Sequence, residues 1–295
     1  FLGLSCFFSP SLALAQSPQP EDSTGRGQSQ LSHAGRHMVA AAHPEAVKAG
    51  LEMLKNGGSA ADAAIAVQLV LNLVEPQSSG IGGGAFALFY DARARDTIAY
   101  DGRETAPREI KPDHFLKTDG TPLKFSDALL GGHAVGTPGT VALLAKLHRE
   151  HGKLPWAELF EPAIQLAKNG FAVGPRLAAM LQGPRAERLK TFAATRAYFF
   201  PGDRPLAAGA LRTNPAFAAS LETIATDGPD AFYKGDLAQS IVTAVRNART
   251  NPGLLSRADL AAYKVIRRTP VCQPYRSYRV CGMGPPSSGG LTVGQ

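Results

Sequence analysis

The segment Ala60–Val74 constrains the fold most, because almost every residue in it is apolar and many are alanine. Ser59 directly before it is a good N-cap, and Asp62 takes the N3 position of an arrangement like a capping box. A helix that is apolar on nearly every face has to be covered by other elements. The segment therefore predicts a buried, closely packed helix and a substantial core around it.

Composition fits an ordinary globular protein of mixed secondary structure. Of the 295 residues, 44% are hydrophobic and 19% are charged, which is neither a disordered nor a coiled-coil composition. The formal net charge is +7, but the basic residues are scattered singly and do not alternate with aromatic residues. No nucleic-acid partner is expected, and residues 37–295 are predicted to form one domain.

The N-terminal segment has the pattern of an export signal. Phe1 to Ala15 is apolar and ends in Ala13-Leu14-Ala15, an A-x-A cleavage site, which predicts a signal peptide over residues 1–15. An uncleaved membrane anchor is the alternative, but the run contains Ser and Pro and is short for a membrane span. Residues 16–36 lack apolar periodicity and are predicted to be a disordered lead-in. We expect an exported protein, periplasmic or secreted, with no membrane segment in its mature form.

Local signals along the rest of the chain alternate between helix and strand. They predict strands at 38–42, 85–90, 97–103 and 264–268 and within 271–283. They predict one helix that begins at Pro44 and is ended by Gly57-Gly58, and another that has Thr137 as its N-cap and runs to about His151. Further helices are predicted at 60–74, 156–168, 176–181, 215–225 and 237–248, and a last one begins at Ser256. Long helical and short strand segments with no internal repeat indicate the α+β class.

Two sequence patterns could suggest a cofactor site or a metal site, but the residues around each of them argue against it. Gly80 to Ala85 fits the spacing of a dinucleotide motif, but such a motif follows a strand and opens a helix, and here the order is reversed. His148 and His151 have helical spacing but no evident third ligand, so we interpret them as surface histidines. We expect no metal and no cofactor. Thr292 is interpreted as part of a buried element.

Arg103 is the one side chain that suggests ligand binding. It ends a predicted strand at the point where the sequence becomes polar, and arginine can hold a carboxylate through two parallel hydrogen bonds. Most arginines at strand ends are simply solvated, so the residue pattern leaves both readings open. The residues alone indicate an exported α+β domain.

The two cysteines that remain after removal of a signal peptide are predicted to form a disulfide. Val271 to Tyr275 and Tyr278 to Gly282 form a predicted hairpin, and a two-residue turn between them would place Cys272 opposite Cys281. That pair falls at a non-hydrogen-bonded site, where cross-strand side chains lie closest. Export would supply an oxidising compartment. The turn pair Arg-Ser is not a favoured one, and two buried free thiols are the alternative.

Several blocks of the sequence, in the same order, resemble the gamma-glutamyltranspeptidase (glutathione hydrolase) family. They are Gly57-Gly58-Ser59-Ala60-Ala61-Asp62-Ala63-Ala64, Pro76-Gln77, Gly80-Ile81-Gly82-Gly83-Gly84, Gly102-Arg103-Glu104-Thr105-Ala106-Pro107, Gly136-Thr137-Pro138-Gly139-Thr140-Val141, Gly152-Lys153-Leu154-Pro155-Trp156, Ala231-Phe232-Tyr233-Lys234-Gly235, Asp259-Leu260-Ala261-Ala262-Tyr263 and Pro285-Pro286-Ser287-Ser288-Gly289-Gly290. The resemblance implies an N-terminal-nucleophile hydrolase fold, an αββα sandwich, of which this chain would hold the large-subunit part while the small-subunit half is missing.

The resemblance also implies an activity and a role for Arg103. Family members cleave themselves before a threonine, which becomes the N-terminal nucleophile of a small subunit and attacks a gamma-glutamyl amide. Water or an amino acid or peptide then accepts the glutamyl group. Arg103 stands where the family holds the α-carboxylate of the donor, and the nucleophile is expected beyond Gln295, so the chain should be inactive alone. The alternatives are a related dicarboxylic-acyl (cephalosporin-type) acylase and a non-catalytic binding or scaffold protein. The presence of Arg103 is taken to favour a gamma-glutamyl donor over the acylase substrate.

Overall fold

The computed structural model of the protein describes residues 31–295, and contacts group Ala34–Gln295 into one unit. The predicted signal peptide at 1–15 and most of the predicted lead-in at 16–36 lie outside the described residues. Residues 31–36 contain no helix or strand and are exposed. Within the described part, no helix is long and apolar enough to cross a membrane.

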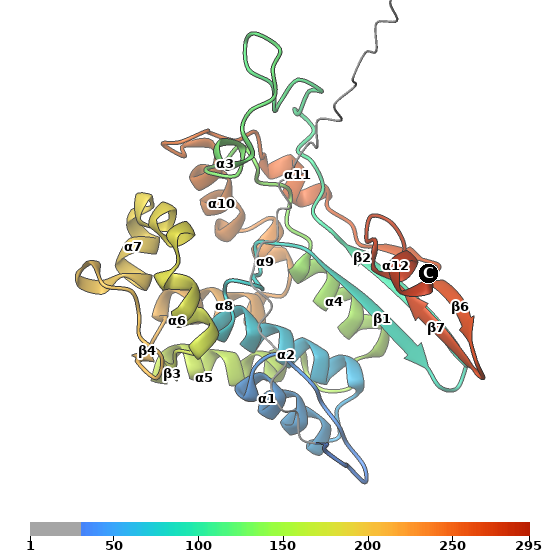
Figure 1. The fold of residues 1–295 in the computed structure, drawn as a ribbon. Helices are drawn as coiled ribbons and strands as arrows, with labels where there is room; N and C mark the ends of the chain where they lie inside the picture. The colour runs from blue at the N-terminus through green and yellow to red at the C-terminus, as the bar shows by residue number, and fades with distance from the viewer. Residues whose placement is uncertain (1–30) are drawn as a thin grey trace, which may run out of the picture. The chain divides into compact units, whose positions relative to one another are not determined.

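Helices and short antiparallel sheets are interleaved along this unit (Figure 1). The α-helices are α1 (Pro44–Lys55), α2 (Ala60–Val74), α3 (Phe125–Ala128), α4 (Thr140–His151), α5 (Glu161–Asn169), α6 (Pro175–Gln182), α7 (Ala193–Phe199), α8 (Pro215–Asp227), α9 (Asp230–Tyr233), α10 (Asp236–Arg246), α11 (Arg257–Ala262) and α12 (Gly289–Gly294). The 3₁₀ helices are η1 (Trp156–Phe160), η2 (Pro184–Thr191) and η3 (Pro201–Asp203), and the strands are β1 (Ala85–Asp91), β2 (Asp96–Gly102), β3 (Phe171–Ala172), β4 (Leu211–Arg212), β5 (Ile266–Arg268), β6 (Val271–Tyr275) and β7 (Tyr278–Gly282).

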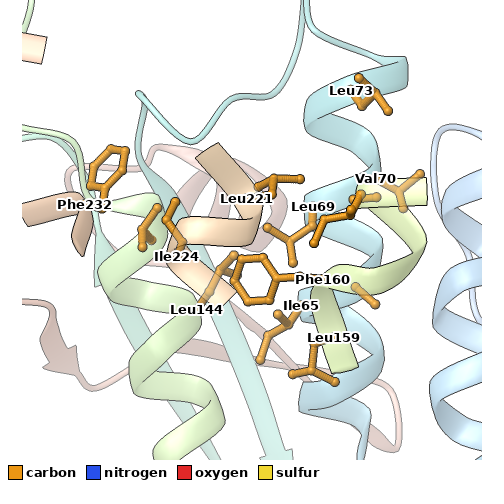
Figure 2. Packing of buried hydrophobic residues seen from close by; sticks show 14 of the residues in the cluster. Ile65, Leu69, Val70, Leu73, Leu144, Leu159, Phe160, Leu221, Ile224 and Phe232 are labelled. Atoms are coloured by element: carbon orange, nitrogen blue, oxygen red, sulfur yellow. The ribbon is translucent and has the colours of Figure 1, made fainter. Parts of the chain in front are cut away.

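The predicted buried helix is confirmed as α2, which lies in the main hydrophobic core. The capping box forms: Ser59 accepts from the N–H of Asp62, and the Asp62 side chain accepts from the N–H of Ser59. Helices α1, α4, α5 and η1 all pack against α2. Figure 2 shows Ile65 and Leu69 of α2 close to Phe160, which η1 supplies. A helix without a polar face is thus covered on several sides.

A second, smaller hydrophobic core is formed within residues 173–206. It is built from buried side chains of the segment that runs from β3 through α6, η2 and α7. Its members are Val173, Leu177, Ala178, Leu181, Ala186, Phe200 and Leu206.

The sheet that carries the candidate site consists of β1, β2 and β5 in antiparallel order. Ala87 and Phe89 of β1 and Ile98 of β2 pack against the main core, and α4 contacts both strands on that side (Figure 1). Side chains of a strand alternate between the two faces of a sheet. Leu88 and Tyr90 therefore point to the opposite face, where they are 43% and 61% exposed.

The strand predicted at 38–42 is wrong. Among the described strands none pairs with this segment, and the backbone there has no regular structure. Its apolar residues serve packing instead, because the Val39 side chain lies against Gly50 of α1. The following helix is confirmed from Pro44, with His43 as the N-cap. Gly57 ends it at a positive φ of 88°, a conformation that glycine adopts without strain.

The predicted start of α4 at Thr137 is also wrong. Thr137 exchanges backbone hydrogen bonds with Thr105, at 2.8 and 3.3 Å, and this bridge keeps it extended. The helix begins at Thr140 instead. The N–H groups of Gly139 and Thr140 donate to the carbonyl oxygen of Gly83, at 2.9 and 3.1 Å. A loop carbonyl therefore satisfies two N–H groups at the helix start that have no partner within the helix.

The C-terminal hairpin has the predicted register. Tyr275 lies opposite Tyr278, and Cys272 lies opposite Cys281. The segment after it differs from the expectation of a buried element. Leu291 and Val293 belong to α12, a short helix that contacts β6 and β7 and leaves both side chains exposed.

The cysteine pair gives a first testable prediction. In the structure the two Sγ atoms are bonded, and the Cα atoms of Cys272 and Cys281 are 4.1 Å apart. Closing so short a loop should stabilise the folded protein by about 2–3 kcal/mol. We expect native, non-reduced protein to resist iodoacetamide at both cysteines and to take two labels after reduction and unfolding. Labelling of both thiols without reductant would contradict the prediction, and the Cys272→Ala/Cys281→Ala variant measures the stabilisation by urea unfolding.

Candidate functional site

Arg103 follows the last residue of β2, where the strand leaves the sheet. Its side chain is 61% exposed, and Nε lies 3.2 Å from Oε2 of Glu104. An exposed ion pair of this kind contributes about 0–1 kcal/mol, so a ligand carboxylate can compete with Glu104 for the guanidinium group. The side chain is therefore available for binding.

The main chain of Arg103, by contrast, is held on both sides. Its N–H donates to Oδ1 of Asp101 at 2.9 Å, and its carbonyl oxygen accepts from the hydroxyl of Tyr263 at 2.7 Å. Asp101 is only 6% exposed, and its second oxygen accepts from Nε of Arg268 on β5 at 2.7 Å. The end of β2 is thus tied to β5 and to the residue that follows α11.

Helix α11 holds the segment after Arg103 at a second point. Ser256 and Asp259 form its capping box, and Oδ1 of Asp259 also accepts from the N–H of Arg108 at 3.1 Å. Burial opposes ionisation of Asp259, but hydrogen bonds from Ser256 and Arg108 outweigh it, and the pKa of the carboxyl group is lowered. The carboxylate form that these donors require is therefore favoured.

Close backbone approaches around Arg103 require glycine at two positions. A Cβ atom on Gly139 would lie 2.1 Å from the carbonyl oxygen of Gly102 and 2.1 Å from the Tyr263 hydroxyl. A Cβ atom on Gly84 would lie 2.7 Å from the carbonyl oxygen of Gly102 and 2.8 Å from the backbone nitrogen of Glu104. All four distances are far below van der Waals contact. The glycine-rich loop before β1, the end of β2 and the start of α4 can meet only because these side chains are absent.

The histidines on α4 are not surface residues, contrary to the prediction. Nε2 of His148 lies 2.8 Å from the carbonyl oxygen of Leu154. The His151 side chain is 15% exposed, stacks on Phe89 at 3.7 Å and lies 2.7 Å from the Tyr100 hydroxyl. His151 faces the sheet because the last turn of α4 packs over β1 and β2, whereas the His148 ring lies 5.3 Å from that of Trp156 on η1. In the described part of the chain, no group of three or more His, Cys, Asp or Glu side chains could hold a metal ion.

Comparison with known proteins assigns the family. Residues 46–295 match the sequence pattern of the family described as Gamma-glutamyltranspeptidase. The chain belongs to the gamma-glutamyltranspeptidase family. It is 38% identical over 293 residues to the glutathione hydrolase proenzyme of Escherichia coli, and the match covers 99% of this chain and 49% of that protein. An acylase ACY 1 proenzyme from Pseudomonas sp. is 35% identical over 265 residues, covering 88% of this chain and 47% of the relative.

The three-dimensional fold agrees with the family. The gamma-glutamyltranspeptidase of Helicobacter pylori superposes with a TM-score of 0.84 at 34% identity, covering 90% of this chain and 74% of that one. The α+β class and the N-terminal-nucleophile hydrolase fold are confirmed; the described residues supply a three-stranded sheet with helices on one face. The chain spans about half the length of the two curated relatives named above.

Four of the family blocks recognised in the sequence meet at Arg103. They are the loop at Gly80 to Gly84, the strand end at Gly102 to Pro107, the loop into α4 at Gly136 to Val141 and the end of α11. Asp101, Tyr263 and Arg268 were not predicted from the sequence to be part of the site. Tyr263 stands inside a recognised block, but no local pattern indicates that its hydroxyl meets a residue on β2.

Proposed function

We propose that this chain is the donor-binding part of a gamma-glutamyl-transferring enzyme and that Arg103 binds the α-carboxylate of the donor. The observation that carries the proposal is the contrast at Arg103: the guanidinium group is exposed, and the main chain is fixed by hydrogen bonds on both sides. A planar guanidinium group can donate two parallel hydrogen bonds to a carboxylate. Membership of the gamma-glutamyltranspeptidase family supports a glutathione-like donor.

The bond-making step belongs, in this proposal, to a threonine on the small subunit of the same precursor. The hydroxyl oxygen attacks the gamma-glutamyl carbonyl, the amine of the donor leaves with a proton, and an ester joins the glutamyl group to the enzyme. Water or the amino group of an amino acid or peptide then takes the glutamyl group and restores the hydroxyl. The proenzyme names of the relatives in E. coli and Pseudomonas sp. support a precursor that is processed.

The exposed face of the sheet is where we propose that the small subunit packs. Leu88 and Tyr90 of β1 point away from the main core, and Ile266 of β5 is 49% exposed. Apolar side chains gathered on one sheet face are typical of a surface that another layer covers. The αββα arrangement of the family needs a second sheet against such a face. Export, supported by the apolar segment before Gln16, is part of the same proposal.

Arg103 does not by itself separate this function from the acylase alternative, contrary to the expectation from the sequence. A glutaryl group carries its terminal carboxylate at the same distance from the scissile amide as a gamma-glutamyl group, and it lacks only the α-amino group. One guanidinium group can therefore hold either acyl chain. The choice of the glutamyl donor rests on the family match.

Three p-nitroanilides test the proposal on the processed precursor that contains this chain. Gamma-glutamyl anilide carries both α-groups, glutaryl anilide lacks the amino group, and 4-aminobutyryl anilide lacks the carboxylate. We expect the highest kcat/KM for the gamma-glutamyl compound and a loss of roughly 10²- to 10⁴-fold without the carboxylate, since two charge-assisted hydrogen bonds disappear. Residues 34–295 alone should release no p-nitroaniline.

The other outcomes select the alternatives. Equal turnover of the glutaryl and gamma-glutamyl compounds would identify an acylase. Processed precursor that cleaves none of the three would support the binding or scaffold protein instead. Turnover by residues 34–295 alone would overturn the placement of the nucleophile on another segment.

A further inference from the structure

The hydrogen bonds at Arg103 hold its backbone and leave its guanidinium group to a ligand. Asp101 accepts from the N–H, and the Tyr263 hydroxyl donates to the carbonyl oxygen, at 2.9 and 2.7 Å. The two partners come from different parts of the chain, since Tyr263 is 160 residues away in sequence. Because the N–H and the carbonyl oxygen of one residue are both held, the point from which its side chain extends is fixed.

We infer that Asp101 and Tyr263 are positioning residues for donor binding, which hold the Arg103 backbone so that its guanidinium group meets the donor carboxylate at a fixed place. The inference rests on the proposed function of Arg103 and adds to it the two groups that set its position. Neither residue is assigned contact with the donor. Misplacement of a group by about 1 Å can lower the rate of an enzymatic reaction by as much as 100-fold, so fixing this backbone should have a measurable effect on the rate.

The Tyr263 hydroxyl is itself rigidly placed. Tyr263 directly follows α11, and its ring stacks on that of Tyr233, with centroids 5.9 Å apart and planes 9° from parallel. Tyr233 is anchored in turn: its hydroxyl donates to the carbonyl oxygen of Pro138 at 2.9 Å and accepts from the N–H of Ala142 at 3.1 Å. Gly139 leaves room for the Tyr263 hydroxyl.

The Tyr263 hydroxyl is also protonated near neutral pH. Burial, followed by the negative charges of Asp101 and Glu104, raises the pKa of Tyr263 to about 12. A phenol with this pKa is protonated at neutral pH, so its hydroxyl can donate to the Arg103 carbonyl oxygen.

The pairing of Asp101 with Arg268 completes the arrangement. A buried carboxylate next to a site for an anion would repel the incoming donor carboxylate. The Arg268 guanidinium group, 2.7 Å from the Asp101 carboxylate, offsets that charge and leaves Oδ1 in place to accept from Arg103. Asp101 therefore fixes the Arg103 backbone, while its negative charge is balanced by the Arg268 side chain of β5.

Tyr263→Phe tests the inference on the processed precursor, because it removes only the hydroxyl and keeps the ring that stacks on Tyr233. We expect KM for gamma-glutamyl p-nitroanilide to rise about 3- to 10-fold, the size of one neutral hydrogen bond, with little change in kcat. The ratio of kcat/KM for this compound to that for the 4-aminobutyryl compound should fall by the same factor. Asp101→Asn, which keeps an acceptor but loses the ion pair, should change the ratio in the same direction.

A double-mutant cycle separates positioning from a general loss of structure. In the Arg103→Ala background Tyr263→Phe should have no further effect, since the group that it positions is gone. Tyr278→Phe is the matched control, because it removes the hydroxyl of an exposed tyrosine on β7, and it should alter kcat/KM for the two anilides by equal factors. Equal factors for Tyr263→Phe as well, or additive effects in the cycle, would overturn the positioning role.

The failure of the inference is distinguishable from the failure of the proposed function. If Arg103→Ala leaves kcat/KM for the gamma-glutamyl compound unchanged, the proposed function is wrong. If Arg103→Ala lowers kcat/KM and Tyr263→Phe does not change it, only the positioning role of Tyr263 is wrong.

Discussion

Replacing Arg103 by alanine in the processed precursor is expected to lower kcat/KM for gamma-glutamyl donors by roughly 10²- to 10⁴-fold. The side chain is exposed and makes one weak ion pair, with Glu104, so its loss should leave the fold intact. Each charge-assisted hydrogen bond to the donor carboxylate contributes about 1.5–3 kcal/mol, and the bidentate pair contains two. Initial rates over a range of donor concentrations measure the loss.

Two further variants show whether a loss of kcat/KM comes from the hydrogen-bond geometry of Arg103 or from the removal of any surface arginine. Arg103→Lys keeps the charge without the planar pair of donors, so its kcat/KM should fall between those of the parent and of Arg103→Ala. Arg93 lies in the exposed turn between β1 and β2, and Arg93→Ala should leave kcat/KM within about twofold of the parent, as is usual for surface substitutions. An Arg103→Ala enzyme with parental kcat/KM and parental melting temperature would exclude the carboxylate role.

The sequence predicted well those elements that local patterns determine. The capping box at Ser59 and the helix start at Ser256 were both predicted, because the residues that determine them lie within one helical turn. The register of the β6–β7 hairpin was correct to the residue, since the two-residue turn leaves few alternatives. Long runs of apolar residues located α2 and β1 for the same reason: the pattern that predicts each element is contained in the element itself.

The failures arose where a distant partner decides the local conformation. Residues 38–42 are apolar enough for a strand, but a strand forms only with a neighbour to pair with. Thr137 has the residue type of an N-cap, yet its backbone pairs with Thr105, and Gly139 is the N-cap of α4. Neither partner can be read from the residues around the affected segment.

The candidate site was predictable only in part for the same reason. Arg103 emerged through the family resemblance, because a strand-end arginine alone does not indicate a binding role. Tyr263, Asp101 and Arg268 meet Arg103 or each other through contacts between α11, β2 and β5, which the fold brings together. Without the structure, the sequence gives no reason to connect Tyr263 with Arg103.

Asp62 is a buried polar residue at the start of α2, and its replacement should strongly destabilise the fold. The side chain is completely buried. Its Oδ2 atom accepts from the N–H and the hydroxyl of Ser59, at 2.7 and 3.0 Å, and from the N–H groups of Lys153 and Leu154, at 2.9 and 3.3 Å. One carboxylate therefore caps α2 and anchors the turn that follows α4.

Asp62→Ala should lower the free energy of unfolding by about 3–5 kcal/mol, because a helix cap is lost and buried N–H groups are left without an acceptor. Urea unfolding of the processed precursor, followed by far-UV circular dichroism, gives this value. Asp62→Asn keeps an acceptor oxygen and should cost less. Asp236, an exposed acid in the first turn of α10, provides the control: Asp236→Ala should stay within about 0.5 kcal/mol of the parent. If Asp62→Ala were no more destabilising than Asp236→Ala, the four hydrogen bonds to Oδ2 would not be what holds α2 and the turn after α4 together.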